Sequence, residues 1–171
     1  MEAFSTDARI LSRRFFAATL VLTMTVYHTL HVLALGLWAG LVATEAVVEL
    51  MGRSNQDLQG AATWMHYRVD MFVELPILVL VLFSGLLLIA ATDPLTSLHL
   101  AKVSCGLAAI CVNLYCVVLV IQRNGALARG DSALACQSRT RRILLCFLLG
   151  GAFAAVAGAL GICLVALRAA S

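Results

Sequence analysis

The four histidines of this chain all lie within, or at the edge of, long apolar segments. His28 and His31 stand one helical turn apart, whereas His66 and His99 open two later segments. An imidazole that faces lipid is costly, so such side chains normally face the interior of a helix bundle and mark a functional site by default. Imidazole nitrogens are common ligands of haem iron and of copper or zinc. The histidines therefore predict a bound haem or metal ion.

Haem b is the cofactor that this arrangement favours. Haem iron takes one or two axial ligands, commonly histidine, and a charged group is needed for the propionates. We expect His31 and His99 to form the axial pair, with His28 and His66 as alternates or as ligands of a second haem. The propionates, or a charge on a substrate, would be met by Lys102, Arg68 or the Arg13-Arg14 pair.

The axial pair depends on how the first apolar run lies in the membrane. If hydrocarbon begins at Phe15, His31 lies ~21 Å deep at 1.5 Å per residue. If hydrocarbon instead ends near Val48, His31 lies level with His99. Glu45 and Glu49 are better placed at an interface than at mid-membrane, so we expect the second register.

Copper or zinc is the competing ligand class. His28, His31 and His99 could form a site of three nitrogens, which suits both metals. The same histidines would then pass a metal ion through the bilayer, as in a copper-handling transporter. In a third, structural interpretation the histidines only bridge helices. Nucleophilic catalysis has little support, because no Ser or Cys stands in a recognisable relation to a base.

Further polar residues recur at steps of three and four, which places them on one face of each helix. The members expected near one membrane face are Glu45, Glu49, His66, Arg68, Asp70, Glu74 and Arg123. Charges of both signs make a self-neutralising network one interpretation, and a proton path or a quinone-headgroup site the other. In the second case Asp70 and Glu74 would handle protons, and Lys102 would join them as a catalytic candidate.

The elements that position these residues follow from composition. The chain is 62% hydrophobic and 12% charged over 171 residues, which is typical of a protein in lipid. Four apolar runs reach the ~20 residues that a helix needs to cross ~30 Å of hydrocarbon. We expect an all-α, integral membrane four-helix bundle in one transmembrane domain over residues 1–171. Its uncleaved spans are predicted at about 15–48, 66–91, 98–122 and 142–168.

The segments outside these spans carry local signals. Residues 1–14 are polar and are expected to be frayed or to lie on the membrane surface. Pro76 predicts a kink in the second span. Asp93-Pro94 ends that span, and the short turn after it predicts a tight antiparallel pair of spans two and three. Residues 123–142 are expected to hold a loop or a short interfacial helix. Small residues in span four predict a close packing surface.

The basic residues bear on orientation and on partners. Most arginines fall in the connections between spans one and two and between spans three and four, and we call this membrane face the loop side. The positive-inside rule then predicts a cytoplasmic loop side, with both termini outside. A bacterial inner membrane is the expected location. The lipid bilayer is the expected environment, and a homo-oligomer is compatible with it. No basic patch with interleaved aromatic residues indicates nucleic acid.

Short motifs resemble a known group of membrane proteins. The segment from His31 to Gly40 resembles the first-helix His-x6-Trp-x-Gly pattern of the copper resistance protein D superfamily and of the related membrane protoporphyrinogen oxidases. Leu98-His99-Leu-Ala-Lys102 and Ser84-Gly85-Leu86-Leu87-Leu88 resemble later segments of those families. The resemblance covers at most the first three spans. It implies a four-helix membrane protein that binds haem b, with functional positions at His31 and Lys102.

These signals together predict a b-type cytochrome-like protein. Haem held between the helices would relay electrons between a membrane quinone, or a small reductant, and a partner protein, so the chain could be a haem-dependent oxidoreductase. The segment Leu41–Glu49 is apolar and acidic where the oxidase family is basic and aromatic. The resemblance therefore favours a wider electron-transfer role over protoporphyrinogen oxidation. Copper transport is the runner-up.

Overall fold

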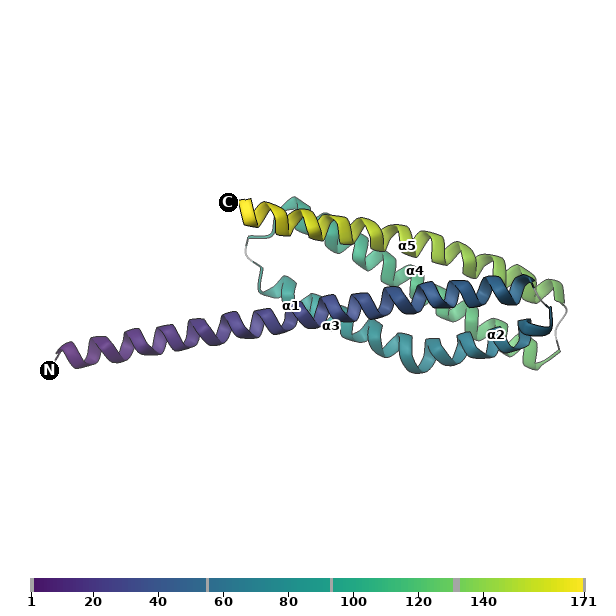
Figure 1. Ribbon diagram of the computed structural model, residues 1–171, viewed down its shortest axis with the longest axis horizontal. Coiled ribbons are helices and arrows are strands. Elements are labelled where there is room, and N and C mark those ends of the chain that lie inside the picture. The colour runs from purple at the N-terminus through teal and green to yellow at the C-terminus, as the bar shows by residue number, and fades with distance from the viewer. Residues whose placement is uncertain (1, 55, 93, 131–132, 171) are drawn as a thin grey trace.

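The computed structural model describes the backbone of residues 2–54, 56–92, 94–130 and 133–170. Within these ranges it describes all side chains except those of residues 2–18, 20–21, 54, 56–57, 133–136 and 168–169. Every element in the described ranges is helical, and Figure 1 shows them as one elongated bundle. The elements are α1 (Glu2–Ser54), α2 (Gln56–Val69), the π-helix η1 (Asp70–Glu74), α3 (Leu75–Ala90), α4 (Ser97–Ala128) and α5 (Ala133–Ala170).

Four of the helical stretches are long and apolar enough to span a membrane, which confirms the predicted all-α membrane bundle. They are Leu22–Arg53, Leu58–Ala90, Ser97–Ala128 and Gln137–Leu167, and the second runs through α2, η1 and α3. Large apolar side chains such as Leu37, Phe83 and Leu148 are exposed on the outer surface of the bundle. An apolar outer surface of this extent fits a lipid environment.

Helix α1 is longer than any bilayer requires. Its 53 residues span about 80 Å at 1.5 Å per residue. Figure 1 shows its first part projecting beyond the other helices, so the bundle packs against the later part of α1. The helix begins at Glu2, so the backbone of residues 2–14 is helical rather than frayed, and a position on the membrane surface stays a prediction for this segment.

The connection between α4 and α5 is shorter than expected. Helix α4 continues to Ala128 and α5 begins at Ala133, so the break expected within residues 123–142 is present but short, and most of that range extends the two helices. Gly130 adopts a left-handed φ of 74°, a conformation that glycine takes without strain. Helix-forming residues continue up to this glycine, which explains why the break falls there.

The second span contains a π-helical turn directly before Pro76. The backbone N–H of Leu75 donates to the carbonyl of Asp70, one residue further back than in an α-helix. Proline has no N–H to donate and its ring crowds the preceding turn, so the wider turn accommodates it. The irregularity predicted at Pro76 thus takes the form of a π-turn that holds Asp70 and Glu74, both buried.

The helices pair differently from the prediction. Helices α2 and α3 pack mainly against α1, while α4 packs along α5. The predicted tight pair of spans two and three is therefore wrong, although a short turn joins them. The reason lies in α5, where Gly150 is buried and a Cβ there would lie 3.5 Å from Cγ1 of Val112. Small residues allow this close approach of α4 and α5.

Among the described residues, two buried apolar clusters join the helices of the bundle. One joins α4 to α5 through Cys116, Leu119, Val120, Ile143 and Cys146. The other joins α1, α3 and α4 through Trp38, Leu78 and Ala109. Cys116 and Cys146 are free thiols that pack as small apolar groups.

Gly85 offers a test of the α1–α3 contact. A Cβ at Gly85 would lie 3.1 Å from Cε1 of His31, whereas a Cβ at Gly106 would meet nothing within 4 Å. We expect Gly85→Val to lower the free energy of unfolding by about 1–3 kcal/mol relative to Gly106→Val, because the larger side chain displaces the imidazole. Denaturant titration of the two variants in one detergent measures this difference. Equal stabilities would contradict the contact.

Candidate functional site

Three helical segments direct a polar stripe into the loop-side half of the bundle. Helix α1 contributes Trp38, Glu45 and Glu49, at steps of seven and four residues. The second span contributes three residues at steps of four, which begin at His66, and α4 contributes Asn113 and Arg123, ten residues apart. These side chains are all buried: Trp38, Glu45, Glu49, His66, Asp70, Glu74, Asn113 and Arg123. The predicted inward direction therefore holds for them, whereas His28 and Arg68, which were expected on the same polar faces, are exposed.

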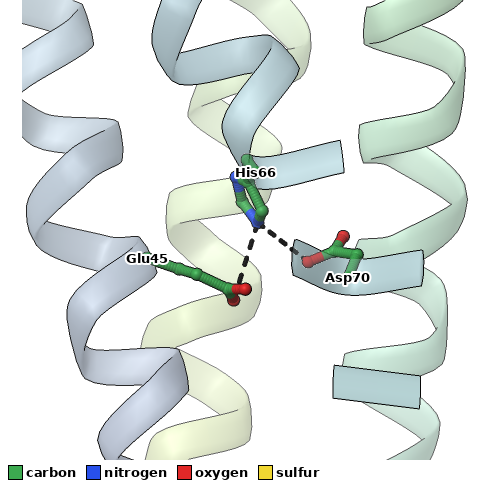
Figure 2. Close-up of side chains that lie close together, drawn as sticks. All are labelled: Glu45, His66 and Asp70. Carbon is green, nitrogen blue, oxygen red and sulfur yellow. Dashed lines mark ion pairs between the residues drawn. The ribbon is translucent and has the colours of Figure 1, made fainter. Parts of the chain in front are cut away.

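His66 lies at the centre of this polar region and is only 1% exposed. Its Nδ1 lies 3.0 Å from Oε2 of Glu49. On the other side of the ring, Nε2 lies 3.4 Å from Oδ1 of Asp70 and 3.8 Å from Oε2 of Glu45 (Figure 2). The ring also stacks on Phe147 at 5.7 Å between centroids. The imidazole is thus fixed in position and faces three carboxyl groups.

Arg123 pairs with Glu49 on the side of His66 that faces the loop end. Its Nη2 donates to Oε2 of Glu49 at 2.9 Å, and its Nη1 donates to Oε1 of the same carboxylate. Nη1 also donates to Oγ1 of Thr140 on α5 at 3.1 Å. Both members of the pair are buried. This two-point contact ties α1, α4 and α5 together and satisfies Glu49.

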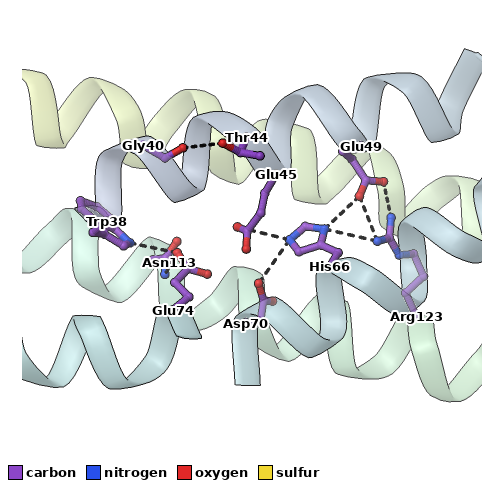
Figure 3. Close-up of polar contacts among 10 residues, drawn as sticks. All are labelled: Trp38, Gly40, Thr44, Glu45, Glu49, His66, Asp70, Glu74, Asn113 and Arg123. Carbon is purple, nitrogen blue, oxygen red and sulfur yellow. Dashed lines mark hydrogen bonds and ion pairs between the residues drawn. The ribbon is translucent and has the colours of Figure 1, made fainter. Parts of the chain in front are cut away.

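Glu74 is satisfied on the opposite side of the polar region. Its Oε1 accepts hydrogen bonds from Nε1 of Trp38 at 2.9 Å and from Nδ2 of Asn113 at 2.8 Å (Figure 3). These donors come from α1 and α4, so the π-turn carrying Glu74 is held between two helices. Figure 3 shows Glu45, His66 and Asp70 lying between the Glu74 and Arg123 contacts.

Glu45 and Asp70 differ from these satisfied carboxylates. They are 4% and 1% exposed, yet no hydrogen-bond donor in the described part of the chain reaches any of their four carboxyl oxygens. Buried polar groups are almost always hydrogen-bonded, and an unsatisfied one calls for an explanation such as an ion. The carboxyl groups of Glu45 and Asp70 also cannot both carry a negative charge inside the bundle without a compensating cation, because buried like charges repel.

Glu45, His66 and Asp70 form what we call the carboxylate–histidine cluster. One ligand atom from each lies within 4.8 Å of the other two, and all three residues are buried. One imidazole nitrogen and two carboxylate oxygens are donors that zinc and other first-row divalent metals accept. Metal–ligand bonds of about 2.0–2.2 Å would need only a small closure of these side chains.

The histidines predicted as an axial pair lie at the other end of the bundle. Nδ1 of His31 on α1 contacts Oγ of Ser84 on α3 at 2.9 Å, and His31 is half-buried. Nδ1 of His99 contacts Oγ1 of Thr96 at 2.7 Å, at the start of α4. Within the described residues no contact joins His31 to His99, and the side chain of His28 is exposed. The axial pair therefore stays a prediction.

The predicted cationic partners lie away from the carboxylate–histidine cluster. Arg68 is exposed, and its guanidinium lies over the rings of Trp64 and Phe72 at 5.4 and 5.7 Å. Lys102 extends along α5, since its Nζ would lie 3.5 Å from a Cβ at Gly161. The side chains of Arg13 and Arg14 lie outside the described residues. Arg68 therefore packs on exposed aromatic rings, and its role toward a cofactor stays a prediction.

The sequence-based site residues are only partly brought together. His66, Asp70 and Glu74 meet as expected, and Glu45, Glu49 and Arg123 join them. The donors Trp38, Asn113 and Thr140 were not assigned a role from the sequence. Helical spacing carried the signal for two of them, because Trp38 lies seven residues before Glu45 and Asn113 lies ten residues before Arg123. Thr140 lies in the segment expected to be a loop, where helical spacing was not applied.

Comparisons with protein families, with characterised proteins and with solved structures give no match to this chain. Function is therefore argued from the geometry of the site.

Proposed function

We propose that this protein binds a divalent transition-metal ion inside the membrane, as the substrate of a transport step, with Glu45, His66 and Asp70 as ligands. The observation that carries the proposal is the pair of buried carboxyl groups, Glu45 and Asp70, that lack hydrogen-bond donors and face one imidazole. This interpretation follows the metal-transport alternative drawn from the sequence, but it moves the site to the loop side and retains only His66 among the four histidines.

The charge of the polar region supports a cation as the missing partner. Four carboxyl groups are buried among the described residues, whereas Arg123 and His66 are the buried basic groups. Arg123 is already paired with Glu49, and Glu74 accepts two neutral donors. Glu45 and Asp70 therefore need either bound protons or a cation. A divalent ion held between them would neutralise both carboxylates at once.

The donor set narrows the class of metal. Soft thiolate or thioether ligands select copper(I), and the cluster contains neither. A nitrogen with two carboxylate oxygens suits zinc, iron(II) or manganese(II). The affinity of such a site also rises along the series from manganese(II) to copper(II), so copper(II) would compete in vitro.

Access from the loop side supports transport rather than a permanently enclosed ion. A narrow recess of about 130 Å³ opens at this end of the bundle and reaches Glu49. Its other lining residues are mostly small or polar: Gly52, Arg53, Gln59, Ala62, Thr63, Gln137 and Thr140. Glu49 lines the recess and contacts His66, so this carboxylate links the recess to the carboxylate–histidine cluster.

Metal titration tests the proposal directly. We expect the purified protein in lipid nanodiscs to bind one Co²⁺ or Zn²⁺ per chain, read by isothermal titration and by the Co²⁺ absorption spectrum. His66→Ala removes the nitrogen ligand and should abolish this binding. His28→Ala is the matched control, because it removes an exposed imidazole from α1. Equal binding by both variants, or no binding by the parent protein, would overturn the proposal.

A flux assay tests the transport step. Proteoliposomes that enclose a metal-sensitive dye should respond to external Zn²⁺ faster with the parent protein than with His66→Ala. Stoichiometric binding without flux in these vesicles would limit the protein to metal binding and would refute transport.

Haem b electron transfer is the second candidate function. One observation favours it: Nδ1 of His31 contacts Ser84, so Nε2 is the nitrogen that would face a metal. Ligating histidines typically use their second ring nitrogen in such a hydrogen bond. A dithionite-reduced b-type spectrum that is lost in His31→Ala and in His99→Ala would support this candidate and the predicted axial pair.

A further inference from the structure

A second, wider hollow opens at the loop-side end of the bundle, between the end of α1 and the start of α5. Its volume is about 560 Å³, and five of the described residues line it: Arg53, Gln137, Ser138, Thr140 and Arg141. We call it the basic hollow. Two of these residues carry guanidinium groups and the other three carry hydroxyl or amide groups, so this described lining contains no acidic or apolar side chain.

This lining differs from that of an ordinary ligand pocket. Small-molecule sites of about 300–1,000 Å³ are lined mainly by apolar side chains with a few polar groups. The polar and cationic side chains that the structure describes around this hollow favour a compact anionic ligand. Guanidinium groups match phosphate oxygens with two parallel hydrogen bonds, and hydroxyl and amide groups add further donors.

The position of the basic hollow indicates where such an anion comes from. Arg53 lies one residue before the end of α1, and Gln137 lies near the start of α5. The hollow therefore lies at the loop-side end of two membrane-spanning helices, where phospholipid headgroups meet the protein. Basic pockets between transmembrane helices are known to take anionic headgroups. Arg53 and Arg141 are both exposed, so a headgroup can approach them.

We propose that the basic hollow binds the phosphate of an anionic phospholipid headgroup, with Arg53 and Arg141 as the charged contacts. The basic hollow shares Arg53, Gln137 and Thr140 with the recess that reaches Glu49, but it contains none of the three residues of the carboxylate–histidine cluster. The lipid proposal therefore does not depend on metal binding. Soluble phosphate esters carry the same chemistry, and the location at the end of two spans favours the lipid as their source.

Lipid titration with native mass spectrometry tests the site. We expect the delipidated protein to bind phosphatidylglycerol more tightly than phosphatidylcholine. The double variant Arg53→Gln/Arg141→Gln should raise the dissociation constant for phosphatidylglycerol by about tenfold or more. The matched control is Arg68→Gln/Arg142→Gln, which removes the same charge from two exposed arginines that do not line the hollow. It should leave the dissociation constant nearly unchanged.

Two results would overturn the assignment. Equal weakening by both double variants would show that general surface charge, not the hollow, attracts the lipid. Binding of soluble glycerol phosphate to the lipid-free protein as tightly as phosphatidylglycerol would show that the hollow takes a soluble ester instead. Because Arg53 and Arg141 are exposed, both double variants should keep the unfolding temperature of the parent protein, which the same samples can confirm.

Discussion

Replacing Arg123 with glutamine is expected to lower the free energy of unfolding by about 3–5 kcal/mol. Arg123 and Glu49 are 2% and 3% exposed, and the guanidinium contacts both oxygens of the carboxylate. Removing one member of a buried ion pair leaves the other charge buried without its partner, which is far more costly than losing an exposed pair. Denaturant titration in detergent, followed by circular dichroism, measures the loss.

A second variant shows how much of the lost stability comes from the unpaired charge of Glu49 and how much from other effects of Arg123→Gln. Arg123→Gln/Glu49→Gln removes both charges and should recover most of the lost stability, because a neutral glutamine can still accept a hydrogen bond from His66. Arg142→Gln, at an exposed position on α5, should change stability by less than about 0.5 kcal/mol. A double variant less stable than Arg123→Gln alone would refute the buried pair as the cause.

Much of the fold follows from hydrophobic length and helical periodicity. The apolar runs predicted the spans, and the spacing of Asp70, Glu74, Asn113 and Arg123 predicted their inward direction, because only one face of each helix meets the others. Helix pairing could not be predicted in the same way. It depends on how closely α5 approaches α4 at Gly150, which is a property of two surfaces rather than of one segment.

The π-turn marks another limit of sequence reasoning. Pro76 predicts an irregular helix because proline has no N–H to donate, but either a kink or a widened turn can accommodate it. Which of the two forms determines where Asp70 and Glu74 lie relative to α1 and α4. Their contacts across the bundle therefore had to be seen in the structure.

Only part of the site was predicted, because histidines rather than carboxylates were taken as the main ligands. Histidine is the commoner haem ligand, so the cofactor was expected beside His31 and His99, at the end of the bundle opposite the loop side. The structure shows the largest group of buried ionisable side chains near His66 instead, among the residues that it describes. Glu45 and Glu49 were both expected to face the interior of the bundle. Only Glu49 is paired with a cation, and that cation, Arg123, is far away in sequence, so the difference between the two carboxylates could not be predicted.

Glu45→Gln is expected to change metal binding and intrinsic stability in opposite directions. Without metal, the substitution removes a buried carboxylate that no described donor reaches, and its new amide can donate to the neighbouring oxygens of Asp70. We expect the free energy of unfolding to rise by about 1–2 kcal/mol, since an unsatisfied buried polar group costs about 1–3 kcal/mol. Unfolding of the protein treated with a chelator measures this gain.

With metal, the order of the two proteins should reverse. A ligand present at 100 times its dissociation constant stabilises a folded protein by about 2.7 kcal/mol, so Zn²⁺ should raise the stability of the parent protein by that amount. Glu45→Gln loses one ligand and should gain almost nothing from Zn²⁺ at the same concentration. Glu49→Gln is the informative comparison, because its carboxylate is already paired with Arg123 and neutralising it should destabilise the metal-free protein. If Glu45→Gln also destabilised the metal-free protein, Glu45 would have a partner of its own, and the need for a cation in the carboxylate–histidine cluster would disappear.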